Sequence, residues 1–409
     1  MDLAILEAYD DRRDFSNKGF KSACYAPFVS MFFDTLGQVR VCCVNYSYTL
    51  GNVRSQRLDD IWNGAATKTL REAMAGYDFG LGCDHCKWQI QDGHPFPHST
   101  KYDLYPIPAE GEFWPRNMEF NLSNTCNLEC VMCSGELSSA IRSRRDRYPP
   151  LAKVYDDQFF LDLRKYLPHL VATQCLGGEP FLIREQYRVW DMLIEDGLKP
   201  ACQITTNGTQ YNDKVERILN NLPVEITISM DGISKETLES LRINVRHDEL
   251  MANFHRFHAY SKAHGRGVGF NFTLMRQNWH EFADFLLFAE QWGSNVNVCT
   301  LLHPAPYALY TLPTEEIRSV VAELERRDDE MCRSLVVNRK AWSDVLTRSA
   351  GASVTRGTRA WSSYRRDSAS HFATSRAYCG PRSRRFTRLT ASLSRGADGR
   401  KPSAASKRI

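Results

Sequence analysis

The sequence has 409 residues, 43% of them apolar, which is enough to build a substantial core over two or three domains. The net charge of +4 is unevenly distributed along the chain. Residues 348–409 hold fifteen Lys and Arg against two acids, a net charge of +13, so residues 1–347 carry a net charge of +4 − 13 = −9. No run of eighteen apolar residues occurs, and the acidic start MDLAILEAYDDRRDF lacks the cationic region of a signal peptide. The sequence therefore predicts a cytoplasmic protein without a membrane span.

Residues 20–90 predict a small cysteine-rich unit. CYAPFVSMFFDTLGQVRVCC favours a hairpin with Gly37 at its turn, and LDDIWNGAATKTLREAMAGY favours a helix that the motif CDHC follows. In a reducing cytosol, clustered thiols favour metal ligation over disulfides. Residues 91–114, which are rich in Pro, Gly and His, resemble a linker. The first two predicted segments are thus a module over 1–90 and a linker over 91–114.

Residues 115–305 repeat one theme six times: a β-rich run, a polar or glycine-containing turn, and a helical pattern. The runs are NMEFNLS (117–123), VATQCLGG (171–178), ACQITTNG (201–208), VEITISMDG (224–232), VGFNFTLM (268–275) and NVNVCTLL (295–302). Strands that alternate with helices predict a parallel sheet, and six units fit a partial (β/α)6 barrel of the α/β class, related to the TIM barrel. Polar and glycine residues gather at the ends of the runs, which predicts a site on one rim of the barrel.

The remaining residues fall into two segments. Residues 306–347 predict a helical extension of the barrel. Residues 348–409 hold twelve serines and thirteen arginines with few aliphatic residues, a composition that favours a disordered basic tail. The abrupt change of composition is also consistent with an out-of-frame C-terminus. A basic tail can bind phosphates, but no recognised nucleic-acid module accompanies it.

The loop NLSNTCNLECVMCSGE, residues 121–136, places Cys126, Cys130 and Cys133 directly after the first barrel strand. Thiolates are soft ligands that suit zinc and iron–sulfur clusters. A structural zinc site takes four protein ligands, whereas three thiolates can hold three irons of a cubane and leave the fourth iron open. Because three unliganded thiols in one loop would oxidise readily, the spacing predicts a metal site.

This Cys-x3-Cys-x2-Cys spacing, after the first strand of a six-fold βα pattern, resembles the radical S-adenosylmethionine (SAM) enzymes. The resemblance implies that SAM chelates the open iron of a 4Fe–4S cluster through its amino and carboxylate groups. It also implies that an electron from the reduced cluster cleaves SAM to methionine and a 5′-deoxyadenosyl radical. That radical then removes a hydrogen atom from the substrate, and no catalytic side chain is indicated for this step.

The later strand ends also resemble this family. GGEP is similar to the segment that meets the SAM amino group, since glycines let the backbone come close and an ammonium needs acceptors. ISMDG resembles the ribose-binding segment, and an arginine after that strand is implied for the SAM carboxylate. The residues implied to contact SAM are Gly177, Gly178, Glu179, Asn207, Ser229, Asp231, Arg242 and Asn278, with Arg246 as the alternative to Arg242. The family often has an aromatic residue before the third cysteine, where Met132 stands here; Met132 and Leu301 are expected to pack against adenine.

The first cysteine set resembles the start of the SPASM domain, which carries auxiliary 4Fe–4S clusters. Two departures are visible, because the module precedes the barrel and the cysteines for a second auxiliary cluster are missing after Cys86. The resemblance therefore implies one auxiliary cluster, with Cys42 favoured over Cys43 by the spacing from Gly37. Its ligands are predicted to be Cys24, Cys42, Cys83 and Cys86. A closed zinc site is the alternative that four cysteines leave open.

Together these resemblances predict a radical SAM enzyme of the oxidoreductase type that modifies a peptide or protein. Its expected partners are this substrate and an electron donor such as flavodoxin or ferredoxin, with no membrane and no nucleic acid. One alternative is a radical SAM dehydrogenase or epimerase acting on a carbohydrate or another small metabolite. A non-enzyme alternative is a zinc-binding protein that interacts with nucleic acid.

Overall fold

Nine strands form one sheet in the computed structural model, which describes residues 1–351 except 95, 109–110 and 302. The strand order is β3-β2-β1-β4-β5-β6-β7-β8-β9. The barrel strands are β4 (Asn117–Phe120), β5 (Ala172–Cys175), β6 (Ala201–Thr206), β7 (Val224–Ser229), β8 (Gly269–Leu274) and β9 (Val296–Thr300). Neighbouring barrel strands pair in parallel throughout and follow chain order. This is the partial barrel that the six repeated units predict.

The N-terminal module extends this sheet. Its strands are β1 (Ser30–Phe33), β2 (Gln38–Arg40) and β3 (Gly51–Asn52). β1 and β2 form the expected antiparallel hairpin, and Gly37 at its turn has a φ of +80°. β1 also pairs in parallel with β4, with Ser30 opposite Asn117 and Phe33 opposite Phe120. The cysteine-rich module is therefore hydrogen-bonded to the edge strand of the barrel.

One predicted helix of the module is two helices in the structure. The module's helices are α1 (Leu3–Asp10), α2 (Ala26–Val29), α3 (Leu58–Trp62), α4 (Ala65–Ala75) and α5 (Asp84–Gln91). The break between α3 and α4 lies at Asn63 and Gly64, where an added Cβ on Gly64 would lie 2.2 Å from the carbonyl oxygen of Asp60. Glycine is thus required where the chain turns between these helices. Within 91–114, the 3-10 helix η1 (His98–Tyr102) packs with its Tyr102 fully buried.

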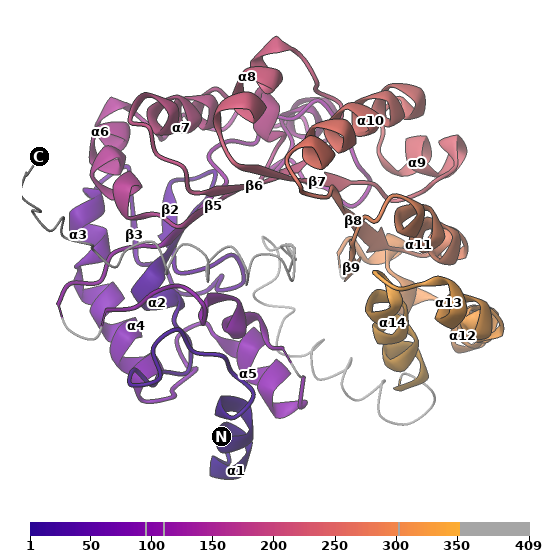
Figure 1. Cartoon of the computed structure of the whole chain (residues 1–409), viewed down its shortest axis with the longest axis horizontal. Coiled ribbons are helices and arrows are strands. Elements are labelled where there is room, and N and C mark those ends of the chain that lie inside the picture. The colour runs from indigo at the N-terminus through magenta and orange to yellow at the C-terminus, as the bar shows by residue number, and fades with distance from the viewer. Residues whose placement is uncertain (95, 109–110, 302, 352–409) are drawn as a thin grey trace, which may run out of the picture.

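The barrel helices lie along the outer side of the arc of strands, as Figure 1 shows. They are α6 (Asp157–Tyr166), α7 (Arg184–Glu195), α8 (Asp213–Asn221), α9 (Lys235–Leu241), α10 (His247–Ala263) and α11 (Phe282–Gln291). Successive side chains of a strand point to opposite faces of the sheet. In β4, Met118 and Phe120 belong to the main hydrophobic core. Asn117 and Glu119 project to the opposite face of the same strand.

Three helices follow β9 and lie at that end of the sheet in Figure 1: α12 (Thr314–Arg326), α13 (Asp328–Ser334) and α14 (Arg339–Gly351). Trp342 of α14 is buried and stacks on Phe282 of α11, with ring centroids 5.8 Å apart. These helices follow the barrel in the chain, and α14 continues to Gly351, so residues 348–351 of the predicted basic tail are helical. The rest of the predicted tail, from 352 onward, lies outside the described residues.

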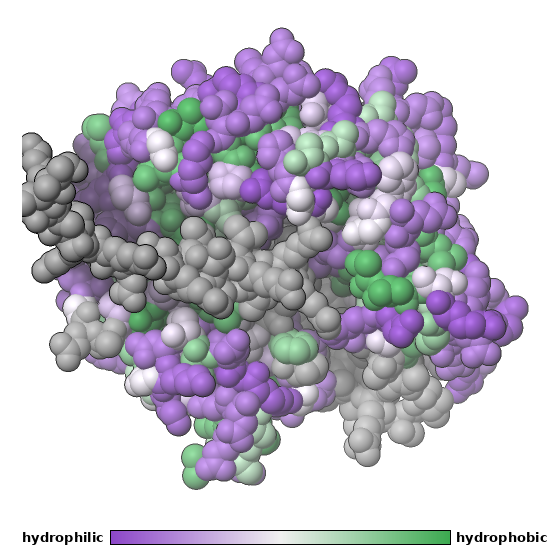
Figure 2. All heavy atoms as spheres, in the orientation of Figure 1, coloured by the Kyte–Doolittle hydropathy of each residue, from purple (hydrophilic) through white to green (hydrophobic). Residues whose placement is uncertain are grey.

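The surface shown in Figure 2 is mostly hydrophilic, with apolar side chains scattered over it. Within the described part of the chain, none of the helices combines the length and apolar character needed to cross a bilayer.

Candidate functional site

The three-cysteine loop follows β4 and is fixed by hydrogen bonds at both ends. Asn124 Nδ2 donates to the carbonyl oxygen of Gly135 at 2.8 Å, and Ser138 Oγ donates to that of Leu128 at 2.6 Å. The backbone N–H of Val131 donates to the carbonyl oxygen of Leu241 at the end of α9. The loop is thus held between the β4 end and α9, at the rim where barrel sites lie.

Two of the three thiols of this loop, those of Cys126 and Cys130, face nitrogen donors. Cys130 is buried, whereas Cys126 and Cys133 are half-buried. Cys126 Sγ accepts from Leu128 N at 3.5 Å, and Arg242 Nη1 lies 3.9 Å from Cys130 Sγ. Burial raises the pKa of Cys126 and of Cys130 to about 12. Since a metal binds the thiolate, loading this loop releases protons, and the N–H groups are suited to stabilise the sulfur charge that results.

The GGEP segment after β5 lies against the cysteine loop. Both glycines have positive φ, +72° for Gly177 and +50° for Gly178. A Cβ on Gly178 would lie 2.4 Å from the carbonyl oxygen of Thr125, and one on Gly177 would lie 1.5 Å from Asn121 Oδ1. Only glycine permits this close approach. It places the buried Glu179 beside the loop, where its N–H donates to Thr125 O at 2.8 Å.

Glu179 is held by donors from its own turn and from the end of β6. Oε1 accepts from Thr206 Oγ1 at 2.8 Å and Oε2 accepts from Asn207 N at 2.7 Å. Phe181 N donates to Oε1 at 3.1 Å. Burial raises the pKa of Glu179 to about 7, although these three donors act in the opposite direction. Its carboxylate therefore titrates near neutral pH.

The side chain of Asn207 connects the β6 end to the cysteine loop. Its Nδ2 donates to Asn127 Oδ1 at 3.0 Å and lies 3.8 Å from Cys126 Sγ. The predicted Glu179 and Asn207 thus share one site with the first cysteine.

Asp231 and Arg242 form a buried ion pair at the end of β7, with 2.6 Å between Arg242 Nη2 and Asp231 Oδ2. Asp231 Oδ1 also accepts from Thr273 N of β8 at 2.6 Å. Arg246, by contrast, has a 77% exposed side chain and pairs with Glu249. Of the two candidate arginines, only Arg242 therefore lies against a cysteine of the loop.

Asn278 and Ser229 complete the predicted set. The side-chain amide of Asn278 hydrogen-bonds to backbone groups. Its Nδ2 donates to the carbonyl oxygens of Asp231 and Thr273, each at 2.9 Å, and its Oδ1 accepts from Met275 N. Both N–H groups of this amide are used, so Asn278 braces the loops after β7 and β8. Ser229, half-buried, ends β7 opposite Asn271 of β8.

A small apolar cluster lies at the same rim. It contains Leu241, Met275 and Leu301, with Val131, Met132 and Tyr307 packed against it. Met132 and Leu301, the two residues expected to pack against adenine, thus belong to one cluster.

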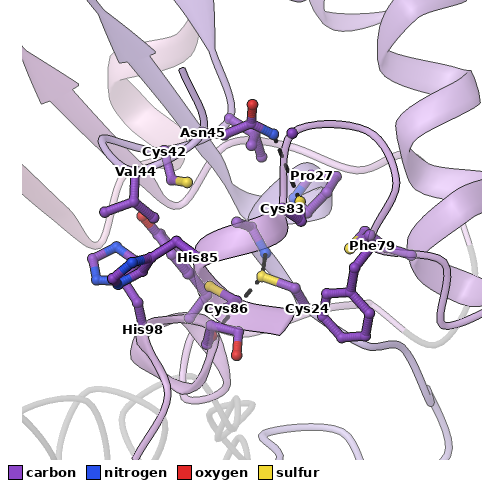
Figure 3. A pocket seen from close by; sticks show the side chains of 16 residues that line it. Cys24, Pro27, Cys42, Val44, Asn45, Phe79, Cys83, His85, Cys86 and His98 are labelled. Carbon is purple, nitrogen blue, oxygen red and sulfur yellow. Dashed lines mark hydrogen bonds between the residues drawn. The ribbon is translucent and has the colours of Figure 1, made fainter. Parts of the chain in front are cut away.

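The second cysteine set lines one cavity in the N-terminal module, shown in Figure 3. Its lining includes all four predicted ligands: Cys24, Cys42, Cys83 and Cys86. Cys24 Sγ accepts from Ala26 N at 3.4 Å, and Asn45 Nδ2 lies 3.6 Å from Cys83 Sγ. His85 and His98 line the same cavity. His85 lies in the first turn of α5.

Cys42 and Cys43 differ in position. Cys42 lines the cavity, whereas Cys43 packs with Phe32 and Leu176 in a separate apolar cluster. This geometry favours Cys42 as the ligand, in agreement with the spacing from Gly37.

The four thiols of this cavity are the donor set that a four-iron cluster needs. A cubane takes each thiolate on a different iron, whereas a structural zinc ion takes four ligands on one metal, with Zn–S distances of about 2.3 Å. Because Cys24, Cys42, Cys83 and Cys86 all line the cavity, their chemistry fits a cluster held by four thiolates.

A buried polar group that sequence reasoning missed joins the cavity to the barrel. Tyr102 of η1 lines the cavity, and its hydroxyl donates to Glu119 Oε1 of β4 at 2.8 Å. Lys101 Nζ donates to the same oxygen at 2.8 Å and to Gln174 Oε1 of β5 at 3.0 Å. The one sequence signal was an acidic residue inside an otherwise strand-like run, NMEFNLS. This group ties the segment between module and barrel to the inner face of the sheet.

The fold is thus a parallel partial barrel of the α/β class that carries a three-thiol loop on its rim and is preceded by a four-thiol cavity. Residues 120–289 match the family model of the radical SAM superfamily, and residues 24–87 match that of the SPASM iron–sulfur cluster-binding domain. The chain therefore carries a radical SAM domain preceded by an SPASM domain. Radical SAM domains hold a 4Fe–4S cluster and SAM, and SPASM domains hold auxiliary iron–sulfur clusters.

The chain is also similar to individual proteins. A GTP 3′,8-cyclase of Erythrobacter litoralis (strain HTCC2594) is 26% identical over 195 residues, which are 46% of this chain and 54% of that protein. The chain thus matches about half the length of this curated relative. Among solved structures, anSMEcpe with bound SAM has 15% identity and a TM-score of 0.40, covering 54% of this chain and 62% of that one. SuiB of Streptococcus suis bound to SAM has 15% identity and a TM-score of 0.34, covering 60% and 50%.

The side chains at the rim fit SAM as well as a cluster. Besides the three thiols, Asn121 Oδ1 is buried beside Gly177 and has no hydrogen-bond partner among the described residues. A buried acceptor without a donor is costly, and the ammonium of SAM would supply one.

Proposed function

We propose that this protein reductively cleaves SAM at the rim of its barrel and abstracts a hydrogen atom from its substrate. The observation that carries the proposal is the meeting of three thiols with Glu179, Asn207 and Arg242 at one rim. Cys126, Cys130 and Cys133 would hold the cluster. When bound, the cluster and SAM supply a 5′-deoxyadenosyl radical.

The roles of the surrounding residues follow from their chemistry. Gly177 and Gly178 bring the backbone close, and Glu179 accepts from the SAM ammonium. Arg242, whose Nη1 lies 3.9 Å from Cys130 Sγ, would pair with the SAM carboxylate. Ser229 and Asp231 are proposed for the ribose hydroxyls, and Asn278 would act by holding the Asp231 backbone. Cys24, Cys42, Cys83 and Cys86 would hold one auxiliary cluster.

The direct test is anaerobic incubation of the reconstituted, reduced protein with SAM, followed by measurement of 5′-deoxyadenosine. Formation of 5′-deoxyadenosine and methionine supports the proposal. A protein that holds its iron but leaves SAM intact under reduction would contradict it.

We further propose a peptide or protein substrate, because radical SAM domains paired with SPASM domains resemble peptide-modifying enzymes. The net charge of −9 over residues 1–347 is suited to a neutral or cationic partner. A small-molecule substrate is the second candidate, favoured by the similarity to a protein named as a GTP cyclase. Mass spectrometry separates the two: a mass change on a peptide encoded beside the gene supports the first, and turnover of a small metabolite alone supports the second.

SAM binding is expected to depend on pH through Glu179. The ionised form binds the ammonium, and with a pKa of about 7 the carboxyl is about one-tenth ionised at pH 6 and about nine-tenths ionised at pH 8. Affinity should therefore rise roughly tenfold between these pH values, as measured by anaerobic equilibrium dialysis of the cluster-loaded protein. Glu179→Gln should remove most of this dependence; an equally steep profile in that variant would assign it to another group.

Replacing Cys83 with serine should separate the two cysteine sets. Cys83 lines the auxiliary cavity, whose lining includes none of the three loop cysteines, so uncoupled SAM cleavage is expected to persist while substrate turnover falls at least tenfold. Iron content should fall from about eight toward about four per chain, by the count of two four-iron clusters. Full substrate turnover by the variant would argue against an auxiliary role for this site.

A further inference from the structure

A run of arginines lies beside the three-cysteine loop. Residues 142–147, RSRRDR, contain four arginines, and the π-helix η2 (Ile141–Arg145) carries three of them. Arg144, Arg145 and Arg147 are exposed, and the neighbouring Tyr148 is 62% exposed. An exposed aromatic ring among cations is typical of a surface that contacts another protein.

These arginines contact the loop itself. Arg145 Nη2 donates to the carbonyl oxygen of Cys133 at 2.7 Å, and Arg144 Nη1 pairs with Glu129 Oε1 at 3.1 Å. On the other side of the loop, Glu129 N donates to the carbonyl oxygen of Ile243. Ile243 is 43% exposed and precedes the exposed Arg246. We call Arg144, Arg145, Arg147, Tyr148, Ile243 and Arg246 the arginine surface.

The local charge contrasts with that of the rest of residues 1–347. Segment 134–150 holds four arginines against Glu136 and Asp146, while residues 1–347 as a whole carry −9. Glu129, Asp146 and Glu249 pair with Arg144, Arg145 and Arg246 respectively. Within the described residues, Arg147 forms no such ion pair. Exposed pairs of this kind are weak and exchange readily with a partner's carboxylates.

We propose that the arginine surface is the docking site for a small acidic electron-carrier protein. This inference rests on the proposed function, which requires one electron for each SAM cleaved. The reduced carrier loses one electron and the cluster held by Cys126, Cys130 and Cys133 gains it, with no other group exchanged. A carrier bound here lies against the loop that holds the cluster, and its negative charge matches the exposed Arg144, Arg145 and Arg147 beside that loop.

The test compares electron delivery by a protein with delivery by a small anion. In the full chain, Arg144→Glu and Arg147→Glu are combined, leaving Arg145 and its contact to Cys133 in place. The matched control combines Arg318→Glu and Arg326→Glu, two exposed arginines of α12 that also form weak surface pairs. The probes are an acidic reduced flavodoxin and dithionite, with 5′-deoxyadenosine and flavodoxin affinity as readouts.

At low salt, the R144E/R147E variant should lose at least tenfold in flavodoxin affinity and in the flavodoxin-driven rate, while its dithionite-driven rate changes less than twofold. The control variant should behave like the original protein. Unchanged flavodoxin affinity in R144E/R147E, or an equal loss in the control, would overturn the proposal. Normal electron delivery combined with lost binding of an RNA oligonucleotide would show a nucleic-acid site instead. Absence of SAM cleavage with dithionite in the original protein would count against the proposed function. The flavodoxin affinities of the original protein and of R144E/R147E would still test the docking site in that case.

Discussion

Replacing Cys130 with alanine is expected to abolish 5′-deoxyadenosine formation, a loss of at least a thousandfold relative to the original protein. Cys130 is the most buried of the three loop cysteines and faces Arg242. Its removal takes away one of three thiolate anchors, and no other cysteine of the described residues lies in that loop. The measurement is anaerobic SAM cleavage after reconstitution, with iron content determined on the same sample.

The matched control is Cys332→Ala, which changes an exposed cysteine of α13 far along the chain from the loop. This control should retain both iron and SAM cleavage. Continued 5′-deoxyadenosine production by Cys130→Ala would show that the loop does not hold the catalytic cluster.

Replacing Lys101 with methionine should destabilise the fold by about 3–5 kcal/mol, because it leaves a buried charge without its partner. The side chains of Lys101 and Glu119 are 14% and 0% exposed, and their Nζ and Oε1 atoms lie 2.8 Å apart. The expected result is a lower urea midpoint of unfolding for the reconstituted protein, together with weaker retention of the auxiliary cluster.

Two further variants make this test specific. Lys101→Met combined with Glu119→Gln removes both charges and should recover more than half of the lost stability. Lys165→Met, at an exposed pair with Asp59, should cost less than about 1 kcal/mol. Equal losses for Lys101→Met and Lys165→Met would mean that the buried pair does not hold the two parts of the chain together.

The repeated units and the two cysteine sets could be predicted from the sequence, because both are local patterns. Parallel strands end at the same rim, so residues that follow the β-rich runs, such as Cys126, Glu179 and Asp231, were expected to lie near one another. The structure brings Cys126 and Glu179 together through Asn207. It also pairs Asp231 with Arg242, which the sequence left undecided against Arg246.

The pairing of β1 with β4 could not be predicted, because strands more than eighty residues apart carry no local signal of their register. The Lys101–Glu119 pair was missed for the same reason: its two residues lie in a segment read as a linker and in a strand. Gly64 shows a different limit, since a single glycine in a helical pattern is compatible with both a continuous helix and a break. In the structure the helix breaks at Gly64, whose backbone lies too close to the carbonyl oxygen of Asp60 to leave room for a Cβ.

In the proposed protein, one cluster keeps a position open for SAM while the other is closed by four thiolates. The most direct test is the electron paramagnetic resonance spectrum of the reduced protein, recorded before and after SAM is added. We predict signals from two four-iron clusters, of which SAM changes one and leaves the other unaltered; Cys83→Ser should remove the unaltered signal. Spectra that SAM does not change, or a protein that binds zinc and no iron, would contradict the account.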